Sequence, residues 1–133
     1  MSEGVIIEAT ADVSAGERPI PTGEGLTFEK RDENDKTLAE IDILLENDTT
    51  IMAVEVKSRP AEKDIAHHIK RLEILRDYRR KKNDQRKIQG AIAGAIFGVP
   101  EKQATIEAGL YVLEQSGDTM RIDIPNGFVP RVF

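Results

Sequence analysis

The feature that most constrains the fold is a pair of strand-forming segments joined by a short polar turn. Residues 41–45 and 51–57 are rich in aliphatic and β-branched side chains, and the turn formers of residues 46–50 lie between them. Two such runs at this spacing predict a β-hairpin. A fold for this chain must therefore bring these two segments together as antiparallel neighbours.

An amphipathic helix is predicted directly after the hairpin. Pro60 suits a first helical position, where its missing N–H is not needed. Apolar residues then recur at spacings of three and four and form one stripe: Ile65, Ile69, Leu72, Leu75 and Tyr78. The next segment, residues 90–98, is apolar on both faces, as in a strand buried between layers. Its glycines, Gly90, Gly94 and Gly98, indicate close packing of a helix on this strand.

The last third of the chain adds a second helix and a second hairpin. The helix is predicted from Pro100 to Ala108, with Gly109 as its terminator. The hairpin is predicted over residues 110–114 and 120–124. The predicted class is therefore α/β, a mixed β-sheet with a central strand–helix–strand crossover, flanking helices and antiparallel edges.

The first part of the chain differs in composition from the rest. Residues 9–25 are rich in Ala, Gly, Pro and Thr and predict an extended arm. A strand is expected over residues 26–30 and a turn over residues 32–36. We therefore expect an N-terminal arm or hairpin over residues 1–37 and one α/β domain over residues 38–133.

Charge is distributed unevenly along the sequence. The net charge is -5, yet residues 57–87 hold 12 basic and 5 acidic side chains. A basic segment of this kind can attract phosphate. The best candidates for nucleic-acid contact lie at the end of the predicted helix: Arg76, Arg79, Arg80, Lys81 and Lys82. A solvated helix end explains the same residues equally well.

Composition excludes several other classes of site. Without cysteine, the chain can form neither a disulfide nor a thiolate metal site, and it has no cysteine nucleophile. The longest apolar run is too short to cross a membrane, and no secretion signal is evident, so a cytoplasmic protein is expected. His67 and His68 are adjacent on the helix and cannot chelate one ion together, so surface or interface positions are expected.

The register of the central hairpin predicts a cluster of charged side chains. If the turn centres on Asp48 and Thr49, Asp42 lies opposite Glu55 and Glu40 lies opposite Lys57. The alternate side chains of the second strand would point into a core: Met52, Val54 and Val56.

Paired carboxylates of this kind favour a divalent cation. Opposed Cβ atoms are about 4.5–5.5 Å apart, where two carboxylates repel each other. Mg²⁺ would relieve the repulsion, and a nearby lysine could orient or help to deprotonate a metal-bound water. An exposed face with a surface ion pair between Glu40 and Lys57 is the alternative, and a slip of one residue would move a carboxylate to the other face.

These segments resemble the PD-(D/E)XK nuclease superfamily, which has the restriction-endonuclease-like or tRNA-endonuclease-like fold. The similarity is carried by Glu40-Ile41-Asp42-Ile43-Leu44-Leu45, by Val54-Glu55-Val56-Lys57-Ser58 and by the helix that follows. The later Gly109-Leu110-Tyr111-Val112 and Asn126-Gly127-Phe128-Val129-Pro130-Arg131 resemble an uncharacterised prokaryotic branch. The resemblance covers residues 38–133.

The resemblance implies a Mg²⁺-dependent hydrolysis of DNA phosphodiester bonds, with Mn²⁺ as a possible substitute. It assigns metal binding to Asp42, to Glu55 and to the main-chain carbonyl of Val56. It makes Lys57 the catalytic lysine. We also expect Glu40 to support the metal ligands without contacting the ion itself.

Relatives usually place a helix with an acidic residue before the aspartate strand, and residues 1–37 carry no such pattern. This departure keeps a second hypothesis open, a non-catalytic module that binds DNA or another nucleic acid. A third is a protein-interaction domain that forms a homodimer through an exposed sheet edge.

Overall fold

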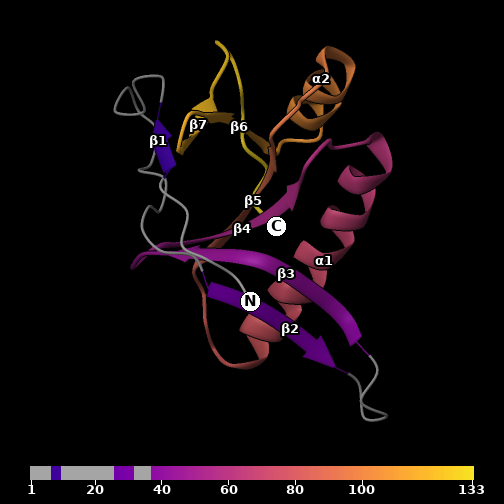
Figure 1. Ribbon diagram of the computed structural model, residues 1–133. Helices are drawn as coiled ribbons and strands as arrows, with labels where there is room; N and C mark the ends of the chain where they lie inside the picture. Colours follow the sequence, from indigo (N-terminus) through magenta and orange to yellow (C-terminus); the bar gives the residue numbers. More distant parts are fainter. Residues whose placement is uncertain (1–6, 10–25, 32–36) are drawn as a thin grey trace.

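The computed structural model describes the backbone of residues 7–9, 26–31 and 37–133 and the side chains of residues 43–133. Most of the predicted arm and the predicted turn over residues 32–36 lie outside this part of the chain. Where the chain is described, it forms a mixed α/β fold with two helices (Figure 1).

The sheet has the order β1-β7-β6-β5-β4-β3-β2. Its strands are β1 (Ile7–Ala9), β2 (Leu26–Arg31), β3 (Thr37–Glu46), β4 (Thr50–Lys57), β5 (Lys87–Gly94), β6 (Tyr111–Ser116) and β7 (Thr119–Asp123). The helices α1 (Glu62–Lys81) and α2 (Val99–Glu107) connect β4 to β5 and β5 to β6. These two connections join parallel strands, whereas β2, β3 and β4 are antiparallel neighbours, as are β6 and β7. The predicted mixed α/β sheet with a strand–helix–strand crossover is therefore confirmed; the pairing of β1 with β7 was not predicted.

The β3–β4 hairpin has the predicted turn and register. Ile43 pairs with Val54, and the next three pairs follow without a shift. Asn47 holds the turn, because its side-chain oxygen accepts hydrogen bonds from the backbone N–H groups of Thr49 and Thr50 at 2.9 and 2.8 Å. The polar turn that the sequence places between the two strands thus fixes their register.

Helix α1 starts two residues later than the sequence predicts. Ala61 is its N-cap, so Pro60 precedes the helix instead of occupying its first position. The Asp64 side chain accepts a hydrogen bond from the Ala61 N–H at 2.8 Å, which satisfies a donor at the helix start. The predicted apolar stripe is confirmed, with Leu72 and Leu75 fully buried.

Strand β5 also differs in its bounds from the predicted segment 90–98. It begins at Lys87 and ends at Gly94. A Cβ atom on Gly90 would lie 2.5 Å from Leu72 Cδ1, and one on Gly94 would lie 2.6 Å from Pro60 Cδ. Helix α1 and the residue before its cap therefore approach this strand closely, as predicted from Gly90 and Gly94. Gly98 was predicted to belong to the same strand, but it lies beyond β5 and is the N-cap of α2.

Side chains alternate between two cores on the two faces of the sheet. Leu44, Ile51 and Ala53 belong to the core that includes both helices, which lie on one side of the sheet in Figure 1. Met52 and Val54 point to the other core, as predicted. Val56 was predicted to be buried there as well, but it is 44% exposed, because it lies at the end of β4, beyond the packed part of that face. No helix in the described part of the chain is both long and apolar enough to span a membrane.

Candidate active site

Glu55 is the buried charge around which the candidate site is built. It is the last buried residue of β4, is 4% exposed and lies on the sheet face that α1 covers. A carboxylate in such a place is costly unless cations or hydrogen-bond donors compensate its charge.

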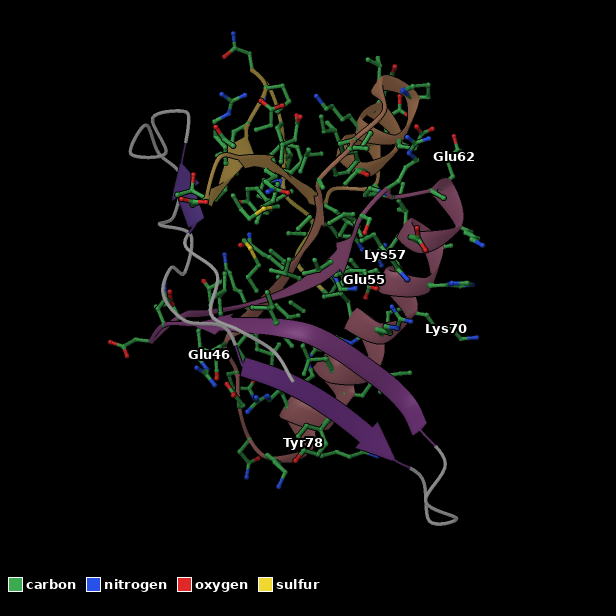
Figure 2. The ribbon with its side chains drawn as sticks, in the orientation of Figure 1. Glu46, Glu55, Lys57, Glu62, Lys70 and Tyr78 are labelled. Carbon is green, nitrogen blue, oxygen red and sulfur yellow. The ribbon has the colours of Figure 1, made fainter. Side chains whose placement is uncertain are left out.

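Two cations approach the Glu55 carboxylate from different elements. Arg71 of α1 donates a hydrogen bond from Nη1 to Oε2 at 2.6 Å. Lys57, two residues further along β4, places Nζ 3.7 Å from Oε1 (Figure 2). The Lys57 side chain is 43% exposed, so the site opens to solvent on the side of this amine.

Three polar residues of α1 face this end of β4. Asp64, His68 and Arg71 follow one another at spacings of four and three and therefore share a helix face. Asp64 Oδ1 lies 4.0 Å from Lys57 Nζ. The helix thus adds a second row of polar side chains beside Glu55 and Lys57, which the sequence did not predict.

The prediction of surface or interface positions holds for His67 but is wrong for His68, which is buried inside the fold. His67 is exposed, but His68 is 0% exposed because its position faces the sheet. A carbonyl oxygen can only accept, so His68 Nε2–H donates to the Ala53 carbonyl at 2.9 Å. The other ring nitrogen, Nδ1, then faces Glu55 Oε2 at 3.9 Å.

Asp42 and Glu40 lie on β3, but their side chains fall outside the described ones. The last described pair is Ile43 with Val54, and the same register continued by one residue puts Asp42 opposite Glu55. Among the side chains of residues 43–133 no group of three acidic or histidine residues could hold a metal ion. A metal site at Glu55 therefore requires Asp42 and remains a prediction.

Arg71 is a cation that the sequence prediction of a metal site does not include. Its guanidinium already balances the charge of Glu55, so repulsion between carboxylates alone does not demand a metal ion. Arg71 could have been found from its spacing to Asp64 and His68. The apolar stripe through Leu72 and Leu75 turns α1 toward the sheet, but it does not show that the face of Asp64, His68 and Arg71 meets Glu55.

The predicted nucleic-acid residues lie at the other end of the same strand and helix. Arg80, Lys81 and Lys82 are exposed there, whereas Arg79 lies within 4 Å of Glu46 and Asp84. Lys82 lies over the ring of Tyr78. Tyr78 and Glu46 are well separated from Glu55 in Figure 2. Thr50 and Glu55 are five positions apart on β4, which corresponds to about 16 Å.

A compact ion-pair cluster joins this basic helix end to the hairpin turn. Arg86 donates from Nη2 to Asp84 at 2.7 Å and to Glu46 at 2.8 Å, and from Nη1 to the Asn47 carbonyl at 3.1 Å. Hydrogen bonds from the Arg86 side chain lower the pKa of Asp84 from its usual 3.8 to about 2, although burial opposes the shift. The cluster holds the α1–β5 connection against the β3–β4 turn.

Comparison with known proteins adds no assignment to this geometry. The chain matches no model of a protein family, and neither a curated protein nor a solved structure shows significant similarity to it. What can be said of its function rests on the buried acid at the end of β4 and the cations around it.

Proposed function

We propose that this chain is a Mg²⁺-dependent nuclease-type domain of the PD-(D/E)XK kind that hydrolyses DNA phosphodiester bonds. The observation that carries the proposal is the buried Glu55 with Lys57 beside its carboxylate. The pairing of Ile43 with Val54 supports it, because the same register continued by one residue would put Asp42 opposite Glu55. An acid and an amine two residues apart at the end of a strand, facing a solvent-open site, can serve phosphodiester hydrolysis.

Each residue has a distinct part in this proposal. Asp42, Glu55 and the Val56 carbonyl would hold the ion, because hard divalent cations prefer oxygen ligands. When bound, Mg²⁺ supplies a Lewis acid for the phosphate and an acidified water. Lys57 would orient that water and Glu40 would support the ligands, while Arg71, which donates to Glu55 Oε2, would hold that carboxylate in place.

The direct test is cleavage of supercoiled and linear DNA in Mg²⁺ or Mn²⁺. Lys57→Ala and Glu55→Gln should each lower the cleavage rate by at least about a hundredfold, because charge stabilisation and water activation are lost. Glu107→Gln, at an exposed glutamate of α2, is the matched control and should leave the rate unchanged.

Cation binding by calorimetry provides an independent measurement on the same proteins. Wild type should bind Mg²⁺ and Asp42→Asn should not. If both give equal or no heat, the metal claim is wrong. Circular dichroism of each variant would separate loss of the site from loss of the fold.

A second function is favoured by one specific contact. Because Arg71 and Lys57 neutralise Glu55 without a metal ion, the same geometry suits a module that binds nucleic acid without cutting it. Salt-sensitive binding of DNA without cleavage in Mg²⁺ would select this alternative. A homodimer through a sheet edge remains a prediction, which a mass measurement during size-exclusion chromatography would test.

A further inference from the structure

A small cavity lies at the carboxyl end of α1, about a strand length away from Glu55. Its volume is about 100 Å³, enough for several water molecules or one phosphate group. Four basic side chains and one acid line it: Arg76, Arg80, Arg86, Lys87 and Asp84. The nuclease proposal makes no use of this cavity.

The only acid among those five residues is already neutralised. Asp84 accepts hydrogen bonds from Arg86 Nε and Nη2 at 3.0 and 2.7 Å. Arg86 is held further by Glu46 and by the Asn47 carbonyl. Asp84 and Arg86 therefore form a charge-balanced part of the cavity wall. The positive charge available to a ligand comes from the other three basic residues, Arg76, Arg80 and Lys87.

Those three cations are available to an anion. Among the described side chains, Arg76 forms a hydrogen bond and ion pair only with Asp77, through Nε. The Asp77 side chain is 62% exposed, so water screens this pair, and both terminal nitrogens of Arg76 are left for other acceptors. Within the side chains of residues 43–133, Arg80 and Lys87 take part in no ion pair. These three cations line one cavity whose acidic side chain, Asp84, is already paired with Arg86, and a phosphate group would complete this arrangement.

Buried apolar side chains form part of the cavity wall and would strengthen the binding of an anion. Ile88 and Phe133 are buried and line the cavity. Phe133 N–H donates to the Ile88 carbonyl at 2.9 Å, which fixes the last residue on β5. Apolar walls lower the local dielectric constant and raise the attraction between a guanidinium and a phosphate oxygen.

We infer that this cavity is a phosphate-binding pocket in which Arg76, Arg80 and Lys87 hold one phosphate group. The group could come from a terminal phosphate monoester or from the diester backbone of a nucleic acid. Guanidinium groups recognise the oxygens of either in pairs. The inference does not rest on metal chemistry at Glu55, because no residue is shared between the two sites.

Calorimetry of the full chain in EDTA tests the inference without any metal-dependent step. The probes are inorganic phosphate and two tetranucleotides of the same sequence, one with and one without a 5′-phosphate. Arg80→Gln and Lys87→Gln should each weaken binding by about tenfold, because each removes one charge-assisted contact. Lys81→Gln removes the same charge from the same end of α1 without touching the cavity, and should change affinity by less than about twofold.

The outcomes are distinct. If only the phosphorylated tetranucleotide binds, the pocket takes a terminal monoester; if both bind and both are weakened by Arg80→Gln, it takes a backbone diester. If no probe binds, or if Lys81→Gln weakens binding as much as Arg80→Gln, the inference is wrong. Repeating the titration with Glu55→Gln keeps this outcome separate from the nuclease proposal, since that variant should bind phosphate as wild type does.

Discussion

At the scale of single residues, the carboxylate of Glu55 is compensated by Arg71 of α1, a contact that the hairpin pattern does not predict. The sequence predicts the strand, the turn and the neighbouring Lys57, and the structure places the two side chains 3.7 Å apart. It does not predict that Arg71 lies nearer to Glu55 than Lys57 does, or that His68 is buried against Ala53. Those contacts depend on how α1 rotates on the sheet, which the packing of Leu72 and Leu75 decides.

Arg71→Gln tests how much the guanidinium beside Glu55 contributes to the free energy of unfolding. Removing one partner of a buried pair costs about 3–5 kcal/mol, and the 30% exposure of Arg71 reduces the expected loss to about 2 kcal/mol in EDTA. If the proposed metal site exists, Mg²⁺ should restore part of this loss in urea unfolding. Lys70→Gln, an exposed neighbour on α1, should show neither effect. Equal stability of wild type and Arg71→Gln would contradict the assigned charge balance.

At the scale of elements, short polar contacts decide how segments distant in sequence meet. The Asp84–Arg86 cluster joins the connection after α1 to the hairpin turn at Glu46 and Asn47. Strand and helix patterns indicate each of these elements, but not that their ends are tied together.

Asp84→Asn should destabilise the fold in a pH-dependent way. The folded-state pKa of Asp84, about 2, is below its usual value, so its ionised form stabilises the fold above about pH 4. That contribution, about 2 kcal/mol at pH 7, should fade as the pH falls from about 4 to about 2. Urea unfolding at several pH values would follow it. Asp118→Asn, at an exposed turn, should differ little from wild type at any pH.

Gly90→Ala tests the close contact between α1 and β5. The added methyl group would lie 2.5 Å from Leu72 Cδ1 and 2.9 Å from Leu110 Cδ2, so both side chains must shift. Overpacking of this kind costs about 1–3 kcal/mol. Thermal unfolding should show a lowered midpoint, and an unchanged midpoint would mean that the core adapts without strain.

The predictable part of the fold consists of periodic patterns. Alternation and helical stripes located the hairpins, both helices and the crossover, because burial imposes those periods on the sequence. The element bounds were less accurate, as at Pro60 and β5, since capping and sheet length are decided by neighbours in space. In the candidate site, the register argument found Glu55 and Lys57 but not the residues of α1.

At the scale of the whole molecule, the two ends of helix α1 lie in chemically different surroundings. At one end, the acid Glu55 lies beside the cations Lys57 and Arg71. At the other end, Arg80 lines the proposed phosphate pocket together with Val132 and Phe133. The net charge of -5 conceals this basic end, so overall charge is a poor guide to what the surface attracts.

Deleting Val132 and Phe133 should affect the molecule as a whole. Phe133 is buried in the helix-side core and bonded to β5, so its loss should cost about 2–3 kcal/mol of unfolding free energy. Urea unfolding would measure this. A truncated chain as stable as the full one would show that the core does not need this ring.

The burial of Phe133 also bears on how the protein should be prepared. An affinity tag fused after this residue would leave directly from the wall of the Arg80 cavity and bring its own acidic or histidine side chains into the space offered to phosphate. Binding measured on such a fusion would report competition with the tag, so the titrations require a chain without a tag after Phe133.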